Sequence, residues 1–128
     1  MVDGSGLVIT DERARDNRYC AYIDGRRIGS VSVILVCETV LIPHVEVDAE
    51  RHDLGIGSLL IRRAFDDARV EGRTVLALCP FAKRWVDLHP GYLDVARRPA
   101  AGEAAAVASL LAADRTVQRL RRDGRVTG

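Results

Sequence analysis

The sequence predicts a mixed α/β domain in which a mostly antiparallel sheet contains one strand–helix–strand unit. Three features carry this prediction. Asp24-Gly25 separates two stretches rich in β-branched and aromatic residues, a glycine-rich turn from His52 to Ser58 opens into a helical pattern, and a short apolar stretch follows that helix. Such an order indicates hairpins first and a strand–helix–strand connection afterwards.

The first predicted elements are two strands of a hairpin, Arg18 to Ile23 and Arg27 to Cys37. The Asp-Gly dipeptide between them supplies the positive φ angles of a tight turn. Cys20 and Cys37 fall within these strands, so both are expected to be buried apolar residues.

A third strand is predicted from Val40 to Val47, where Pro43 indicates an edge, a bulge or a break in pairing because it lacks a backbone N–H. The helix after Gly57 is expected to run to about Glu71, with Gly72 as its left-handed C-terminal cap. Thr74 to Leu78 is then a buried strand.

This strand–helix–strand connection implies that Val45 to Val47 and Val75 to Leu78 run roughly parallel. The glycine-rich turn would then lie at the carboxyl end of a strand. Phe81 to Leu88 is predicted as a short helix, with Pro80 in its first turn and Pro90 ending it.

The composition shifts to Ala, Arg and Gly from Pro99 onward. Broken helical spacing of the apolar residues predicts one helix from about Glu103 to Arg122. We therefore expect a domain over residues 1–98 and a C-terminal helical extension over 99–128, packed on or trailing the same domain. The arginines of the extension suit a solvated face, or contact with a partner or an acidic cofactor.

Composition favours one soluble globular domain, with 128 residues, 48% hydrophobic, 29% charged and a net charge of +1. The near-balanced charge gives no global case for nucleic acid or an anionic membrane. The longest apolar run, Ile28 to Val36, is interrupted by Gly29 and is far shorter than a membrane span. The N-terminus lacks the pattern of a secretory signal.

The three cysteines lie far apart and show no metal-site or redox spacing. Free thiols in a cytoplasmic protein are the simplest interpretation, and no metal site is expected.

The turn from His52 to Ser58 is a candidate phosphate site. Its glycines allow close approach to the backbone, and the unpaired N–H groups of the new helix favour a negative charge. An ordinary helix start is the alternative. A dinucleotide fingerprint would need glycine where Leu60 stands, and a P-loop would need Lys-Ser or Lys-Thr where Ser58-Leu59 stands, so neither signature fits.

Four segments occur together in order and spacing: His44-Val45-Glu46-Val47, His52-Asp53-Leu54-Gly55-Ile56-Gly57, Cys79-Pro80-Phe81 and His89-Pro90-Gly91-Tyr92. Over about Tyr19 to Val95 the chain resembles the small, single-domain branch of the GNAT N-acetyltransferases. The resemblance implies a GNAT-like fold and a transferase that uses acetyl-CoA. The glycine turn would hold the cofactor's pyrophosphate, and the preceding strand would lie along its pantetheine arm.

The resemblance also implies which residues contact the cofactor. They are Val45, Val47, His52, Asp53, Leu54, Gly55, Ile56, Gly57, Ser58, Cys79, Phe81 and Tyr92. Two positions depart from the family pattern: His52 replaces the usual Gln or Arg, and Gly91 stands where the small branch commonly has Glu. These departures motivate an alternative function, a CoA- or acyl-CoA-binding module of the same fold without turnover.

Acetyl transfer requires a neutral amine, yet a lysine-like amine with a pKa of about 10.4 is almost wholly protonated at neutral pH. Strand alternation puts His44 and Glu46 on one face and Val45 and Val47 on the other. His44 and Glu46 are therefore candidate general bases, or alternatively half-exposed residues that make local hydrogen bonds. Backbone N–H groups near a break in this strand are candidates for stabilising the thioester oxyanion.

Cys79 is the third catalytic candidate, because it ends the strand after the glycine-turn helix. A helix start beside it favours the thiolate, which could accept the acetyl group and pass it on. The alternative is a small apolar residue beside the pantetheine. Tyr92 is expected to anchor its segment, or else to act as acid toward the departing thiolate.

The implied partners are acetyl-CoA and an unidentified amine acceptor, either a small molecule or a protein lysine or N-terminus. No nucleic acid or membrane is expected, and the protein would be a monomer or a homodimer. A further alternative is a DNA- or protein-binding accessory that uses the arginine-rich residues after Pro99.

Overall fold

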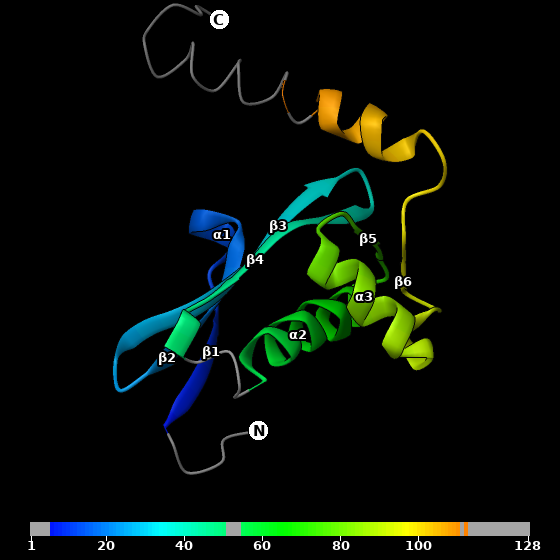
Figure 1. Ribbon diagram of the computed structural model, residues 1–128. Helices are drawn as coiled ribbons and strands as arrows, with labels where there is room; N and C mark the ends of the chain where they lie inside the picture. Colours follow the sequence, from blue (N-terminus) through cyan, green and yellow to red (C-terminus); the bar gives the residue numbers. More distant parts are fainter. Residues whose placement is uncertain (1–5, 51–54, 111, 113–128) are drawn as a thin grey trace, which may run out of the picture. The chain divides into compact units, whose positions relative to one another are not determined.

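The computed structural model describes residues 6–50, 55–110 and 112 (Figure 1). The chain divides into two compact units, Met1–Arg98 and Pro99–Gly128. The first unit contains a six-stranded sheet with the strand order β1-β2-β3-β4-β5-β6. Its strands are β1 (Leu7–Asp11), β2 (Arg18–Ile23), β3 (Arg26–Val36), β4 (Thr39–Val47), β5 (Thr74–Ala77) and β6 (Ala96–Arg97).

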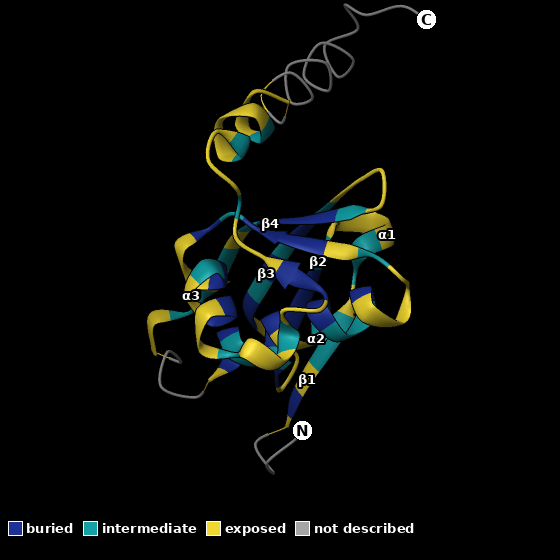
Figure 2. Cartoon of the chain, turned by 90° about the vertical axis from the view of Figure 1, so that its right-hand side faces the viewer, coloured by how far each residue is buried: buried dark blue, intermediate teal, exposed yellow. Residues whose placement is uncertain are grey.

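The pairing is antiparallel from β1 to β4 and parallel from β4 to β6, which confirms the predicted mixed, mostly antiparallel sheet. The first unit also contains α1 (Arg13–Asp16), α2 (Ile56–Val70), α3 (Pro80–Leu88) and a 3₁₀ turn (Pro90–Tyr92). Strand β1 and helix α1 were not predicted. Buried residues gather where α2 and α3 meet the sheet (Figure 2).

The hairpin turn between β2 and β3 is the predicted one, with positive φ angles of 52° at Asp24 and 80° at Gly25. Cys20 is buried in β2, also as predicted. The prediction for Cys37 was wrong, because this residue is exposed. It stands in the short turn that joins β3 to β4, where its φ of 55° takes it out of the strand.

Helix α2 begins after Gly55, whose φ is 68°, and ends before Gly72, whose φ is 72°. At its C-terminus the N–H of Arg73 donates to the carbonyl of Ala68 at 2.9 Å. This bond, reaching back across a left-handed glycine, is the C-terminal cap that the sequence predicts. The apolar stripe of α2 is buried against the sheet and comprises Ile56, Leu60, Ile61, Ala64, Phe65 and Ala68.

Strands β4 and β5 run parallel, as predicted, but they pair through Thr39–Ile42 and Thr74–Ala77 rather than through Val45 to Val47. The ladder ends at Ile42, whose carbonyl accepts the N–H groups of Leu78 at 3.1 Å and Cys79 at 3.2 Å. On the other side of β4, its register with β3 shifts opposite Pro43. The bulge and the start of α3 together separate the two strands beyond Ile42.

The second unit is helical over residues 103–110 and at 112. Its start follows Gly102, whose φ is 82°, and the Glu103 carboxylate accepts the N–H of Ala100 at 2.7 Å. The remainder of the predicted helix lies outside the described residues. Among the described helices, none combines the length and apolar character needed to span a membrane.

Candidate functional site

A pocket of about 330 Å³ opens where β4 leaves β5. It is lined by two β4 residues, the turn and first residues of α2, and the start of α3: Val45, Val47, Gly55, Gly57, Ser58 and Phe81. The structure therefore brings together six of the residues implicated in cofactor binding by the sequence. His52, Asp53 and Leu54 lie outside the described residues.

The polar groups of this pocket come from the backbone of α2. Among the described residues, the first bond at this end runs from Leu59 N–H to the Gly55 carbonyl at 3.1 Å, so the N–H groups of Ile56, Gly57 and Ser58 precede it. Gly55 carries no side chain that could cap them. The Ser58 hydroxyl is already engaged, because it accepts the indole N–H of Trp85 at 2.7 Å. An anion at this end of α2 would meet backbone amides and the positive end of the helix dipole.

The two glycines of the turn serve different purposes. Gly55 adopts a left-handed conformation that L side chains rarely take. Gly57 provides space: a Cβ built there would lie 2.8 Å from Cζ of Phe81. Because Gly57 has no Cβ, the Phe81 ring can lie against it. This ring, which is 45% exposed, forms one wall of the pocket.

Strand β4 presents different chemistry on its two faces, as alternation predicts. Val45 and Val47 pack against the core and line the pocket, whereas the side chains of His44 and Glu46 are 58% and 70% exposed on the other face. Nε2 of His44 lies 2.9 Å from Oε1 of Glu46. The two candidate bases thus form one hydrogen-bonded pair.

One edge of β4 pairs with β3 and the other with β5. The pairing with β5 ends at Ile42, so beyond Ile42 this second edge is not bonded to β5. Asp48 donates its N–H to Ile28 of β3 at 2.8 Å. Because alternate residues of a strand bond to opposite neighbours, the N–H and C=O groups of Glu46 point toward β3. Those of Val45 point toward the opposite edge. This edge borders the valine-lined pocket.

Cys79 is buried, and it acts as the N-cap of α3. Its Sγ accepts the N–H of Ala82 at 3.4 Å. A sulfur atom at an N-cap satisfies one of the helix's unpaired donors, so this contact gives Cys79 a structural role. Cys79 does not line the pocket between β4 and α2.

Tyr92 anchors the segment after α3, as expected from the sequence. Its ring lies 5.9 Å from that of Phe65 and 5.0 Å from that of Trp85. Its hydroxyl donates to Asp66 at 2.8 Å. Burial raises the pKa of Tyr92, and the hydrogen bond to the Asp66 carboxylate raises it further. Tyr92 also lies outside the lining of the pocket.

The family profile of the GCN5-related N-acetyltransferases matches residues 18–95, which is more than half of the chain. The chain belongs to this family. The match spans β2 to the residue before β6, so it contains every element that lines the pocket. No curated protein matches the chain in sequence.

Solved structures share the GNAT fold. A GCN5-like protein from Staphylococcus aureus has 22% identity and a TM-score of 0.60, covering 75% of this chain and 93% of its own. N-acetylglutamate synthase from Neisseria gonorrhoeae, solved with coenzyme A and N-acetyl-glutamate, has 20% identity and a TM-score of 0.51, with coverages of 66% and 22%. The chain spans only 42% of the ribosomal-protein-S18-alanine N-acetyltransferase from Escherichia coli, at 14% identity and a TM-score of 0.44.

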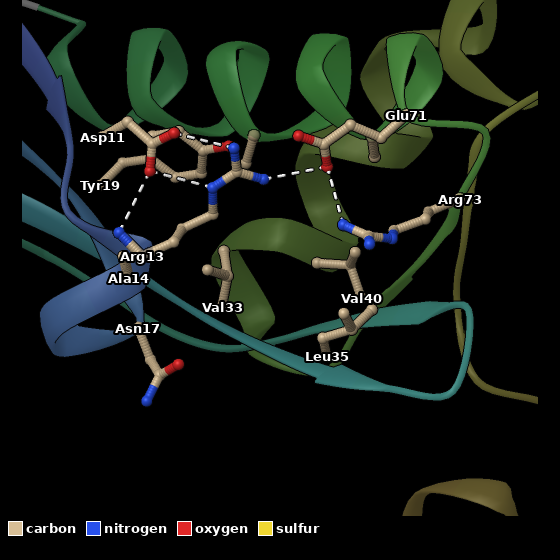
Figure 3. Close-up of a pocket in the computed structure, with 12 residues that line it drawn as sticks. Asp11, Arg13, Ala14, Asn17, Tyr19, Val33, Leu35, Val40, Glu71 and Arg73 are labelled. Atoms are coloured by element: carbon tan, nitrogen blue, oxygen red, sulfur yellow. Dashed lines mark hydrogen bonds and ion pairs between the residues drawn. The ribbon is translucent and has the colours of Figure 1, made fainter.

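A second cavity of this GNAT domain, of about 420 Å³, lies at the C-terminal end of α2 (Figure 3). Charged side chains that line this cavity form hydrogen-bonded ion pairs with one another. Arg13 donates to both carboxylate oxygens of Asp11, at 2.9 and 2.8 Å, and to Oε1 of Glu71 at 3.0 Å. Arg73 donates to the same Glu71 oxygen at 3.0 Å. The hydrogen bond from Arg13 is the main cause that lowers the pKa of Asp11.

Sequence reasoning missed this charged network and two arginines, Arg18 and Arg27, that line a third hollow beside Glu46. Arg13 and Glu71 are 58 residues apart, so no local spacing indicates their contact. Within the described ranges, no group of three or more His, Cys, Asp or Glu side chains is arranged to hold a metal ion.

Proposed function

We propose that the protein is an acetyl-CoA-dependent N-acetyltransferase in which the acceptor amine attacks the thioester directly. The observation that carries this proposal is the pocket between β4 and α2. Apolar walls from Val45, Val47 and Phe81 stand next to the backbone N–H groups that open α2. Membership of the GCN5-related family supports the same assignment.

The pocket's chemistry suits the two parts of CoA that a transferase must hold. The apolar walls match the pantetheine arm, and the amides from Ile56 to Ser58 match a pyrophosphate. Because these donors belong to the backbone, replacing the usual Gln or Arg by His52 leaves the main anion contacts in place. Acetyl-CoA supplies an activated acetyl group. The protein must orient it, deprotonate the amine and stabilise the developing oxyanion.

The His44–Glu46 pair is our candidate for the base. As the amine nitrogen bonds to the acetyl carbon, the carbon–sulfur bond breaks and the base takes the amine proton. The departing thiolate then gains a proton and leaves as CoA. A hydrogen bond from His44 to Glu46 would stabilise a proton taken up by the imidazole. The Val45 N–H, directed to the open edge of β4, is our candidate for the oxyanion donor.

Substitutions on β4 test this assignment. We expect Glu46→Gln and His44→Ala to lower kcat by about 100-fold or more, because general-base catalysis typically contributes that much. The affinity for CoA should stay within about twofold, since neither side chain lines the CoA pocket. Glu38→Gln is the matched control, because Glu38 is 79% exposed in the turn before β4. Unchanged kcat in both β4 variants would overturn the assignment of the base.

Cys79 distinguishes direct attack from an acetyl-cysteine route. Direct attack predicts that Cys79→Ser keeps its kcat, with a hydroxyl replacing sulfur as the N-cap acceptor. Cys79→Ala would lose the cap and unfold at a lower temperature while keeping its activity when folded. Loss of acetyl transfer in both variants, with CoA binding retained, would instead identify Cys79 as a nucleophile.

One observation favours a second candidate, a CoA-binding module without turnover. His44 and Glu46 lie on the face of β4 opposite the valines that line the pocket. If acetyl-CoA binds but neither hydrolysis nor acetyl transfer to a panel of amines occurs, this second function is correct.

A further inference from the structure

The sheet carries a third hollow, of about 480 Å³, beside the His44–Glu46 pair. It spans β2, β3 and β4. Its polar side chains are Arg18, Arg27, Ser30, Glu46 and Asp48. We propose that this hollow binds the acceptor, and that the acceptor is a small amino acid whose carboxylate is held by Arg18. This inference rests on the proposed acetyltransferase function and specifies its substrate class.

Strand register places Arg18 and the candidate bases on one face. Arg18 pairs with Ser32, and Ser32 pairs with His44, so these three form a row across β2, β3 and β4. Ser30 and Glu46 form part of the adjacent row. Residues paired across neighbouring strands point to the same face of the sheet. The hollow is thus bordered by a cation on β2 and by the candidate base on β4.

The Arg18 guanidinium has hydrogen-bonding capacity left for a ligand. Its side chain is 31% exposed, and its ion-pair partner among the described residues is Asp16, whose carboxylate oxygen lies 3.7 Å away, too far for a hydrogen bond. Its Nε is buried and has no hydrogen-bond partner within the described part of the chain. A ligand carboxylate would bind the exposed part of the Arg18 guanidinium through a charge-assisted hydrogen bond.

The two carboxylates that line the hollow, Asp48 and Glu46, interact with different partners. Asp48 lies 3.6 Å from the guanidinium of Arg26, at the rim. Glu46 is bonded to His44, the group that would take the amine proton. An acceptor with a carboxylate toward Arg18 and an amine toward Glu46 would match this separation of charge.

The spacing favours an acceptor whose amine and carboxylate are several bonds apart. Adjacent strands lie about 4.8 Å apart, so the backbones of Arg18 and His44 are separated by about 10 Å across β3. The Arg18 guanidinium lies 3.7 Å from Asp16, and the His44 ring lies 2.9 Å from Glu46 on its own strand, so neither contact brings these two side chains closer than their backbones. We therefore choose 4-aminobutyrate as the probe and butylamine as its matched control, because these amines have nearly equal basicity and differ at the far end of the chain.

The first experiment compares acetyl transfer to the two amines. We expect kcat/KM for 4-aminobutyrate to exceed that for butylamine by about tenfold or more, as removal of a charge-assisted bond would give. Equal values, or a preference for butylamine, would overturn the proposal.

The second experiment replaces the cation. Arg18→Gln should raise KM for 4-aminobutyrate by about tenfold and leave transfer to butylamine unchanged, while Arg18→Lys restores part of the loss. Arg98→Gln removes the same charge from an exposed residue that pairs with Asp87, and should change neither. An equal loss of transfer to both amines in Arg18→Gln would contradict a specific carboxylate contact.

Binding measured without turnover separates this inference from the proposed function. Adding 4-aminobutyrate should shift the amide NMR signals of Ser30 and Glu46 in the wild-type protein, and not in Arg18→Gln. If these shifts occur and no acetyl is transferred, the acceptor site stands and the catalytic proposal fails. If acetyl-CoA is used and 4-aminobutyrate produces no shifts at millimolar concentration, the acceptor site is wrong.

Discussion

The two ends of α2 show that cavity size and ligand-binding capacity are separate properties. The cavity at the C-terminal end has a volume of about 420 Å³, against about 330 Å³ for the pocket at the N-terminal end. The larger cavity is bordered by Arg13, which already donates to the carboxylates of Asp11 and Glu71. The smaller pocket offers backbone donors that precede the first helical bond.

The origin of the polar groups explains the contrast. At the C-terminal end, opposite charges neutralise each other and link β1 and α1 to Glu71, the residue that follows α2. At the N-terminal end, the backbone amides and the helix dipole themselves create a positive potential. An incoming anion would therefore displace the Arg13 contacts at the C-terminal end, whereas at the N-terminal end it would meet backbone amides. We propose a structural role for the larger cavity and cofactor binding for the smaller one.

The largest expected effect distinguishes the two glycines of the proposed cofactor pocket. Gly57→Ala places a methyl group against the Phe81 ring and should push that ring into the pocket, so the Kd for CoA should rise by about tenfold or more. The methyl group of Gly55→Ala meets no atom of the described residues, but the residue must adopt a φ of 68°, at a cost of about 1–2 kcal/mol in stability. Calorimetric titration and thermal unfolding measure the two effects. A larger loss of affinity in Gly55→Ala would contradict the roles assigned here.

The next effect tests the C-terminal network. Arg13→Met leaves Asp11 without its main partner and removes one of the two arginines on Glu71, so the free energy of unfolding should fall by about 1–2 kcal/mol. CoA affinity should stay within twofold, because about 22 Å of helix separates the ends of the 15-residue α2. A large loss of CoA affinity in a folded Arg13→Met protein would show that the two ends are coupled.

A smaller effect tests whether the pocket's donors are backbone groups. Ser58→Ala leaves the Trp85 indole N–H without its partner, which should lower stability by about 1 kcal/mol. CoA affinity should change by less than about threefold, because the Ser58 amide remains. A tenfold loss of affinity at unchanged stability would assign the anion contact to the hydroxyl instead.

The smallest effect is the dependence of stability on pH. Arg13 holds the pKa of Asp11 below its ordinary value of 3.8, so the unfolded chain binds this proton more readily than the folded one. The resulting stabilisation is complete above about pH 4 and is lost as the pH falls through the lower folded pKa. The melting temperatures of wild type and Asp11→Asn should therefore converge between pH 5 and pH 2.

Asp24→Asn supplies the matched control for this titration, since Asp24 is an exposed turn residue whose left-handed conformation asparagine also adopts. A wild-type advantage over Asp11→Asn that stays constant down to pH 2 would contradict the role of the Asp11 carboxylate.

The sequence predicted features that depend on neighbouring residues. Asp24-Gly25 determines its turn through local backbone angles, and Gly72 ends α2 for the same reason. Alternation alone placed His44 and Glu46 together on one face of β4. Each of these follows from the conformational preferences of a few adjacent residues.

Features that depend on distant residues were not predictable. The point at which β4 leaves β5 depends on the bulge at Pro43 and on the start of α3, so the paired segment was misplaced. Cys37 follows an apolar strand, yet it turns out into solvent because the next strand begins at Thr39. The contact between Arg13 and Glu71 exists only after the fold brings α1 beside the C-terminal end of α2.

The central claim is that CoA binds between β4 and the N-terminal end of α2. Amide NMR shifts on addition of CoA test it most directly. The account predicts shifts at Val45, Val47, Gly55 to Ser58 and Phe81, with the residues around Arg13 and Glu71 unchanged. Shifts centred on Arg13 and Glu71, or none at millimolar CoA, would contradict it.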